Sequence, residues 1–412
     1  MPDFALSHKA LSAKPQPIGE LMTKGIAGDT ISLAAGFVAP ETLPSEELAE
    51  VLPDFMRRRG RLALQYGTTE GLLSLRKKVV ERLAARDGQA ARRLSLDRVI
   101  LSTGSQQMLY LLSEVMLDPG DIVITAAPSY FVYLGALQLA QADIIGVPAD
   151  EHGMRTDALR EVLHRIAASG KAARLKIIYV TTYFDNPAGV SLSVERRREM
   201  ADILASFEGT PPLLVEDAAY RELAFDGGDD PSIFSFEGGS RTAYLGTFSK
   251  PFSPGLRTGY AVLPEELAKK VTIFKCAHDF GSSNFAQHLI DYSIEAGIYD
   301  RNVTALRKNY AAKCRLMCDC LERELAGLAN WTEPVGGLYV WVDLGDVETG
   351  PDGEFFAECA REGVIYVPGE FCYPDPKAAP RNKLRLCFGP ISREDIEKGV
   401  ARLGAVLARR GA

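Results

Sequence analysis

Residues 99–112 carry the stretch Val99-Ile-Leu-Ser-Thr-Gly-Ser-Gln-Gln-Met-Leu-Tyr-Leu-Leu112. A short apolar run ends in a turn of small polar residues, and a second apolar stretch with the character of a helix follows the turn. Short, wholly apolar runs are typical of strands that are buried on both faces of a parallel sheet. The same kind of run recurs along the chain, at residues 122–124, 144–145, 177–180 and 213–215.

Amphipathic segments lie between these apolar runs, with apolar residues at helical spacing on one face and charged residues around them. Two of the apolar faces consist of Leu72, Leu75, Val79 and Leu83, and of Met200, Ile203, Leu204 and Phe207. Another helix is predicted to start at residue 46, with Ser45, which precedes two glutamates, as its N-cap. The alternation of strand and helix predicts a doubly wound α/β domain over residues 46–290.

The pattern changes after residue 290. A long helix is predicted over residues 305–328, followed by a strand over residues 337–343, in which Tyr339 and Trp341 alternate and are expected in the core. A strand at residues 383–388 and a helix at residues 394–409 complete the chain. These elements predict a smaller α+β domain. We expect this domain to combine residues 291–412 with the N-terminal residues 1–45.

Composition and charge exclude several classes of protein. The 412 residues include 47 Lys and Arg against 54 Asp and Glu, a net charge of −7, so we expect no nucleic-acid partner. Seven scattered cysteines and the lack of a secretory signal favour a reduced, cytoplasmic protein. No apolar run approaches the roughly 20 residues that cross a membrane, so we expect no membrane contact. We predict no metal site, because Cys314, Cys318 and Cys320 lie in a charged helical stretch without a nearby histidine.

Ligands of open α/β sheets bind at the carboxyl ends of the strands, so the residues after each apolar run are candidates for a site. The turn at residues 102–107 precedes a helix, whose free N–H groups can bind phosphate, although a plain N-cap also explains it. Asn186-Pro187, after the run at residues 177–180, is first of all a turn. Asp217 ends a buried strand, where a carboxylate needs a partner: it either caps a helix or faces a cationic ring nitrogen.

The most informative residues lie between Tyr244 and Tyr260. Lys250 follows an apolar strand among hydroxyl groups and glycines. A lysine in a partly desolvated pocket has a lowered pKa and can form a Schiff base. Thr247, Ser249 and Arg257 supply donors that suit a phosphate dianion. Together with a buried acid after another strand, these groups describe a site for pyridoxal phosphate, which needs a lysine, a phosphate cradle and an acid at its pyridine nitrogen.

From residue 31 to the C-terminus, the sequence resembles the pyridoxal-phosphate-dependent aminotransferases of class I and II, nearest to the branch of 2-aminoadipate, kynurenine and aromatic aminotransferases. The resemblance implies fold type I, with a large, mostly parallel α/β/α domain and a smaller α+β domain. It implies transfer of an amino group from an L-amino acid to a 2-oxo acid, with 2-oxoglutarate as the expected acceptor. It also implies a homodimer with shared active sites.

The resemblance further implies a role for each matching cofactor residue. Lys250 would hold the cofactor as a Schiff base and then move the substrate proton. Asp217 would keep the pyridine nitrogen protonated, and Asn186 and Tyr220 would hydrogen-bond the ring oxygen O3′. Tyr130 would stack on the ring. The phosphate ligands would be Ser105, Gln106, Thr247, Ser249 and Arg257.

Three more positions complete the implied site. Arg385 would bind the α-carboxylate of the substrate, Gly36 would line the substrate pocket, and Tyr66 would reach the phosphate of the neighbouring subunit. Two features depart from the family pattern: Asp185 adds a carboxylate near the site, and residues 370–384 are long and charged. Side-chain specificity therefore does not follow from the resemblance.

Two alternative functions are compatible with this pattern of residues. A β-lyase, a racemase or a ring-forming synthase would use the same cofactor residues with another outcome. A non-catalytic ligand-sensing domain occurs as the aminotransferase-like half of certain bacterial transcription regulators. Those regulators carry a basic winged-helix domain ahead of this fold, and the segment before residue 31 is too short to be one.

Overall fold

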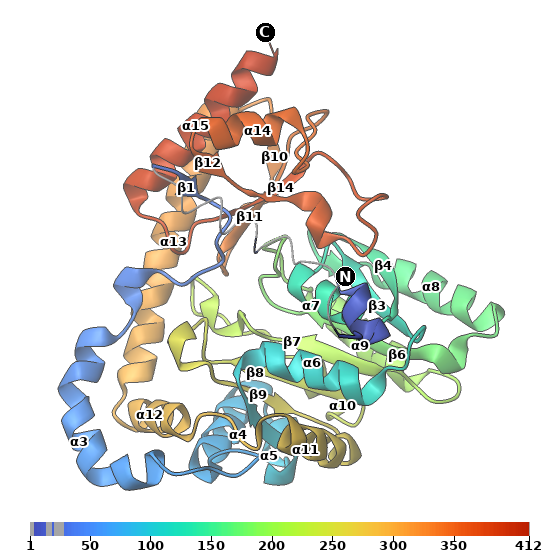
Figure 1. Cartoon of the computed structure of the whole chain (residues 1–412), viewed down its shortest axis with the longest axis vertical. Coiled ribbons are helices and arrows are strands. Elements are labelled where there is room, and N and C mark those ends of the chain that lie inside the picture. The colour runs from blue at the N-terminus through green and yellow to red at the C-terminus, as the bar shows by residue number, and fades with distance from the viewer. Residues whose placement is uncertain (1–3, 14–18, 20–28, 412) are drawn as a thin grey trace.

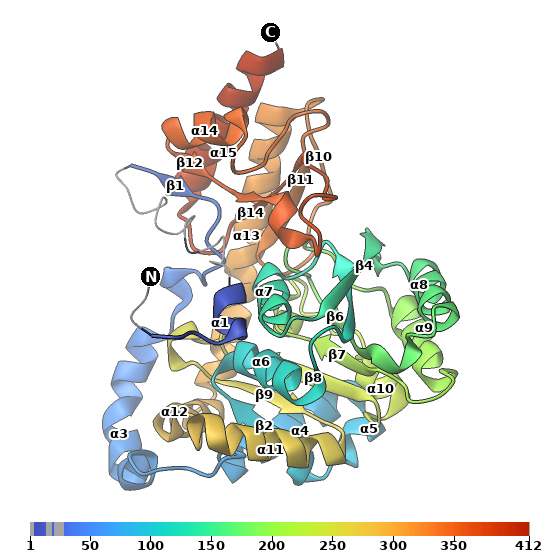
Figure 2. The same cartoon turned by 45° about the vertical axis from the view of Figure 1, so that its right-hand side comes forward.

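A computed structural model of the chain describes residues 4–13, 19 and 29–411. The described residues form a large part around a twisted sheet and a smaller part that lies above it in Figure 1. Helix α13 (Ile298–Leu325) is 28 residues long and runs from the large part into the small one, as both cartoon views show (Figure 2). The two parts are thus joined by a continuous helix.

The large sheet has the strand order β2-β9-β8-β7-β6-β3-β4-β5. Strands β8, β7, β6, β3 and β4 pair in parallel, whereas β9 is antiparallel to both of its neighbours and β5 is antiparallel to β4. The strands are β2 (Val99–Ser102), β3 (Ile122–Ala127), β4 (Asp143–Asp150), β5 (Gly153–Met154), β6 (Leu175–Thr181), β7 (Leu213–Asp217), β8 (Thr242–Thr247) and β9 (Gly259–Val262). This arrangement confirms the predicted, mostly parallel α/β sheet.

Helices cover both faces of the sheet, with α6, α7 and α11 on one face and α8, α9 and α10 on the other (Figure 2). Strand β6 contributes Ile177 to the first core and Ile178 to the second, because successive side chains point to opposite faces. The helices are α6 (Gly104–Met116), α7 (Phe131–Leu139), α8 (Thr156–Ala168), α9 (Val194–Ala205), α10 (Ile233–Glu237) and α11 (Glu265–Asp279). In the part of the chain that is described, no helix is both long and apolar enough for a bilayer crossing.

The remaining helices of the large part lie towards the β2 end of the sheet. In α4 (Leu73–Asp87), Leu75, Val79 and Leu83 are buried as predicted, and α5 (Gln89–Arg92) follows it. Helices α3 (Ser45–Ala63) and α12 (Asn284–Glu295) pack against each other. A short helix, α1 (His8–Ser12), lies beside α6, where Lys9 pairs with Glu114 (Figure 2).

Four details of the sequence prediction were wrong, three of them at element ends. Ser45 is the first residue of α3 rather than its N-cap, a position that Pro44 occupies without a capping side chain. Phe207 lies beyond the end of α9, and Leu72 lies just before α4. The run Ile144–Ile145 is only half-buried, because β4 lies near the edge of the sheet, with only the two-residue β5 beyond it.

The small part contains an antiparallel sheet of order β10-β11-β14-β13 and the parallel pair β1–β12. Its strands are β1 (Ile31–Ser32), β10 (Asn330–Trp331), β11 (Tyr339–Asp343), β12 (Val364–Ile365), β13 (Val367–Pro368) and β14 (Lys383–Cys387). Helices α14 (Glu354–Arg361) and α15 (Arg393–Gly411) pack on each other, and α15 also packs on α13. Because β1 pairs with β12, the N-terminal segment lies beside the C-terminal half of the chain.

Candidate active site

Lys250 lies three residues beyond β8, where the large and small parts meet. Its ammonium group donates a hydrogen bond to the carbonyl oxygen of Gly36 (2.7 Å) and lies 5.9 Å from the centre of the Tyr220 ring. Burial lowers the pKa of Lys250 to about 8, and the guanidinium groups of Arg385 and Arg257 act in the same direction. A lysine with this pKa is available as a neutral amine at mildly alkaline pH.

Asp217 is the last residue of β7, and its side chain is buried. The hydroxyl of Tyr179 (3.0 Å) and the backbone N–H of Ala219 (3.1 Å) donate hydrogen bonds to the carboxylate. Burial raises the pKa of Asp217 to about 6, and these two donors oppose the rise. A cation beside this carboxylate would be strongly favoured. The role of Tyr179 was not apparent from the sequence, because an apolar strand gives no reason to single out one buried tyrosine.

Arg385 lies on β14 of the small part and reaches Asn186, in the loop after β6. One terminal guanidinium nitrogen donates to the Asn186 side-chain oxygen (2.6 Å), and the other donates to the carbonyl of Ala34 (2.5 Å). The guanidinium group lies 4.4 Å from the ring centre of Tyr339 and 5.4 Å from that of Phe131. Its third nitrogen, Nε, is buried and has no partner among the described residues.

Tyr339 was expected to be an ordinary core residue, and that interpretation was incomplete. Its side chain is buried, but its hydroxyl lies 3.2 Å from the hydroxyl of Tyr220 and its ring faces Arg385. A Cβ atom on Gly36 would lie 2.6 Å from the Tyr339 hydroxyl, so a larger residue at position 36 would displace that hydroxyl. The structure thus adds Tyr339 to the predicted site residues.

The turn between β2 and α6 lies against the segment that follows Lys250. Gly104 has φ +73°, and a Cβ atom there would lie 2.9 Å from a guanidinium nitrogen of Arg257. On the other side, a Cβ atom on Gly259 would lie 2.6 Å from the backbone nitrogen of Ser105. The N-terminus of α6 and Arg257 therefore lie side by side, as a phosphate cradle requires.

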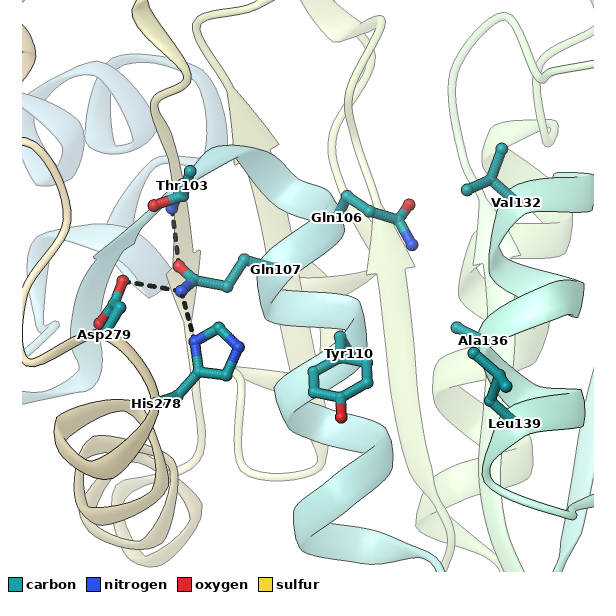
Figure 3. Close-up of a pocket in the computed structure, with 9 residues that line it drawn as sticks. All are labelled: Thr103, Gln106, Gln107, Tyr110, Val132, Ala136, Leu139, His278 and Asp279. Carbon is teal, nitrogen blue, oxygen red and sulfur yellow. Dashed lines mark hydrogen bonds between the residues drawn. The ribbon is translucent and has the colours of Figure 1, made fainter. Parts of the chain in front are cut away.

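The hydroxyl residues of the segment after β8 are also nearby. The Thr247 hydroxyl accepts a hydrogen bond from the backbone N–H of Ser249 (3.0 Å), and both side chains are buried. Gln106 lies on α6, and its side chain points towards α7 in Figure 3. Its side-chain oxygen is buried and unpaired within the described chain.

Tyr130 occupies the N-cap position of α7, beside the same site. Burial raises the pKa of its phenol, and the nearby groups Tyr339 and Asp217 raise it further, whereas Arg385 and Arg257 lower it. The tyrosine is therefore neutral at physiological pH and lies among the other predicted residues.

Tyr66 is the one predicted residue that the described chain leaves apart from this cluster. Its side chain is 83% exposed, and its ring makes an edge contact with Phe280 at 5.8 Å between ring centres. Residues Leu64, Tyr66 and Phe280 line a surface pocket of about 480 Å³ together with neighbouring polar residues.

Asp185, which departs from the family pattern, is buried next to Asn186. One of its carboxylate oxygens has no partner among the described residues. Burial raises the pKa of Asp185 to about 8. The long segment after Gly369 begins with a short helical turn that packs on the start of α7, where the Ser129 N–H donates to the Cys372 carbonyl (2.7 Å).

A family model described as aminotransferase class I and II matches residues 29–403. The chain belongs to this family. The aromatic-amino-acid aminotransferase 1 of Thermococcus litoralis is 33% identical to it over 97% of this chain and 93% of its own length.

Solved structures agree with this assignment. The kynurenine aminotransferase of Pyrococcus horikoshii, solved with PMP, has a TM-score of 0.91 at 32% identity, covering 98% of this chain and 97% of its own. The α-aminoadipate aminotransferase of Thermus thermophilus, complexed with N-(5′-phosphopyridoxyl)-L-leucine, has a TM-score of 0.86 at 32% identity, with the same coverage. These findings confirm the predicted aminotransferase activity, fold type I and pyridoxal phosphate as the cofactor.

The residues of this aminotransferase fit that cofactor. Lys250, Arg257 and Arg385 donate to neutral oxygens, which are the carbonyls of Gly36 and Pro254 and the amide of Asn186. Their positive charges thus remain available for a phosphate and a carboxylate. Nε of Arg385, which has no partner among the described residues, marks a further position where a carboxylate can complete the hydrogen bonding.

Proposed function

We propose that Lys250 binds pyridoxal phosphate covalently and then carries the substrate proton. The cofactor supplies an aldehyde that takes up the amino group and a ring that accepts electrons. The Lys250 amine, with its pKa lowered to about 8, can attack a carbonyl and can accept a proton at Nζ. The observation that carries the proposal is the placement of Nζ between the Gly36 carbonyl and the Tyr220 ring.

We assign the ring contacts to residues at the carboxyl ends of the strands. Asp217 holds a proton on the pyridine nitrogen, because a buried carboxylate pairs best with a cation. Asn186 accepts from Arg385 through its oxygen, so its amide nitrogen is the group left to donate to the ring oxygen. The Tyr220 hydroxyl acts beside it, and the Tyr130 ring stacks on the cofactor.

We assign the phosphate to the N-terminus of α6. The ligands are Ser105, Gln106, Thr247, Ser249 and Arg257. The close approach of Arg257 to Gly104, where a Cβ atom would lie 2.9 Å from the guanidinium group, supports this assignment. Backbone N–H groups at a helix start and a guanidinium group together form a strong anion site.

Arg385 binds the α-carboxylate of the amino acid and of the 2-oxo acid, with Gly36 beside it in the pocket. The support is its burial between two aromatic rings, with Nε unpaired within the part of the chain that the structure describes. Arginine and carboxylate form paired, charge-assisted hydrogen bonds. We propose 2-oxoglutarate as the amino acceptor.

The active enzyme is a homodimer in which Tyr66 reaches the phosphate of the neighbouring subunit. The support is an exposed apolar surface around Tyr66 that includes Leu62, Leu64 and Phe280. Exposed apolar patches of this kind mark interfaces. We also place the enzyme in the cytoplasm, because its seven cysteines are free thiols.

We propose residues 46–290 as the cofactor domain and residues 1–45 with 291–412 as the small domain. Within the N-terminal segment, α1 packs beside α6 of the large part, and residues 1–3, 14–18 and 20–28 lie outside the described residues. The pairing of Ile31 with Val364 supports this division, because it ties the N-terminal segment to the C-terminal half.

The test compares the wild-type enzyme with Lys250→Ala and with the control Lys270→Ala, which changes an exposed lysine. We expect Lys250→Ala to lower turnover by about 10²–10⁴-fold or more, since a proton carrier is lost. Normal turnover by Lys250→Ala would overturn the proposal. Release of 2-oxo acid beyond one equivalent per active site only when an acceptor 2-oxo acid is added supports transamination, whereas many turnovers to product without an acceptor indicate a lyase or racemase.

A further inference from the structure

A polar network lies behind the turn that opens α6, and Figure 3 shows most of it. The backbone N–H of Thr103 donates to the side-chain oxygen of Gln107 (2.7 Å), whose amide nitrogen donates to Asp279 (2.7 Å). The same nitrogen lies 3.2 Å from Nδ1 of His278. Because Asp279 ends α11, the network joins the end of one helix to the start of another.

Asp279 fixes the orientation of the Gln107 amide. A carboxylate only accepts hydrogen bonds and the N–H of Thr103 only donates, so the amide must turn its nitrogen to Asp279 and its oxygen to the turn. The reversed amide would place donor against donor and acceptor against acceptor, and would lose both bonds. The side chain of Gln106, the residue before Gln107 on α6, points in the opposite direction, towards α7 (Figure 3).

A buried lysine holds Asp279 in place. Lys275 donates to both oxygens of Asp279 (2.8 and 3.0 Å) and to the Ser282 hydroxyl (3.0 Å), and its side chain is 0% exposed. Burial alone would raise the pKa of Asp279, but donors from Gln107 and Lys275 outweigh it, and the pKa is lowered. The Thr103 hydroxyl donates to Ser282 (3.1 Å), which gives the turn a second link to this network.

The opposite side of the same turn has no room to move. There β9 packs against it at Gly259, where a Cβ atom would lie 2.6 Å from the backbone nitrogen of Ser105. The turn is therefore held between β9 on one side and the amide of Gln107 on the other. Releasing the Gln107 side gives the turn freedom that it lacks in the intact protein.

We propose that Asp279 is a positioning residue for the cofactor: through Gln107 it holds the turn that binds the phosphate. The inference rests on the proposed function in placing the phosphate at the start of α6. Asp279 itself touches no reacting atom, and its effect is on cofactor affinity rather than on proton transfer.

The test uses full-length variants matched in charge. Lys275→Met/Asp279→Leu removes both charges and the acceptor for Gln107. Lys275→Met/Asp279→Asn also removes both charges, but the introduced amide keeps an oxygen at the position of the Asp279 oxygen that accepts from Gln107 (2.7 Å) and from the Ser282 hydroxyl (3.2 Å). Neither variant leaves an unpaired buried charge, the usual cause of large losses in stability. Gln107→Met removes the amide and leaves the Lys275–Asp279 pair intact.

The measurements are the dissociation constant of pyridoxal phosphate for each apoprotein by equilibrium dialysis, and the unfolding midpoint of each apoprotein. For one lost hydrogen bond, we expect Lys275→Met/Asp279→Leu and Gln107→Met to bind about tenfold more weakly. We expect Lys275→Met/Asp279→Asn to bind within about twofold of wild type, as a rescue that a role in stability alone would not produce. At saturating cofactor, KM for the amino donor stays unchanged.

Equal affinity in Gln107→Met and the wild type would overturn the inference, and so would equal losses in the two double variants. If the wild-type protein bound no pyridoxal phosphate, the proposed function would fail. If it bound the cofactor normally and Gln107→Met did too, only the role of Asp279 would fail.

Discussion

Replacing Gly259 by alanine tests the proposed phosphate cradle directly. The added Cβ atom would lie 2.6 Å from the backbone nitrogen of Ser105, 2.7 Å from the carbonyl carbon of Gly104 and 3.0 Å from its Cα. All three atoms belong to backbone that opens α6, so no flexible side chain can yield. To reach an ordinary contact of 3.4 Å, β9 and the turn must separate by about 0.8 Å.

This separation has a cost in stability and in affinity. Overpacking a rigid site costs about 1–3 kcal/mol, which we expect to appear as a lower free energy of unfolding of the apoprotein. The phosphate then meets N–H groups that are displaced from Arg257. Losing the geometry of one charge-assisted hydrogen bond costs roughly 1.5–3 kcal/mol, or about 10–100-fold in the dissociation constant of pyridoxal phosphate.

The assay combines urea unfolding of the apoprotein with equilibrium dialysis against the cofactor. Gly255→Ala is the matched control, because the nearest atom to its Cβ position, the Ser253 hydroxyl, is 3.8 Å away. We expect the control to behave like wild type in both measurements. Wild-type affinity in Gly259→Ala would refute the close packing of β9 on the turn.

Three further predictions concern charge at the junction of the two parts. The rate constant for covalent capture of added pyridoxal phosphate by the apoprotein should increase as the pH rises through about 8, because Lys250 loses its proton there. A rate constant from stopped-flow absorbance that does not change across this pH range would contradict the pKa shift. In the folded protein, the pKa of Asp185 is raised from 3.8 to about 8, so the free energy of unfolding of the wild type should fall relative to that of Asp185→Asn as the pH rises from about 4 to 8. The same difference in urea midpoint between the two proteins at pH 5 and at pH 8 would contradict this. Arg385→Lys should lower kcat/KM by about 10–100-fold, since a lysine cannot reach Asn186, Ala34 and a carboxylate together, and an unchanged value would exclude a direct role.

The sequence predicted the parts of the fold and site that local pattern controls. The apolar runs before Ser105 and Lys250 indicated buried strands, and the small residues after them indicated turns at a ligand-binding edge. These features depend on neighbours within a few residues, so the order of residues is enough to recognise them. Resemblance to a known family then gave roles to distant residues such as Arg385.

The sequence did not predict contacts between distant segments. Tyr339 alternates on a strand like a core residue, and its role depends on Tyr220, 119 residues away. Tyr179 is one of several buried tyrosines, and only its distance to Asp217 distinguishes it. No pattern in the sequence distinguishes Lys275 from the other lysines, and its side chain is fully buried. For both tyrosines the deciding partner comes from another element, and periodicity carries no information about it.

The buried cations also show why the site is selective for anions in a protein of net charge −7. The nitrogens Nε, Nη1 and Nη2 of Arg197 each donate to a backbone carbonyl, so this buried arginine has a structural role. Among the described residues, Arg385 finds partners only for its two terminal nitrogens and none for Nε, and Lys250 donates to one neutral carbonyl. A buried charge whose hydrogen bonds are only partly satisfied by neutral oxygens costs folding free energy unless a ligand supplies the missing partner. The site is thus prepared for anionic groups by local hydrogen bonding, whatever the sign of the whole molecule.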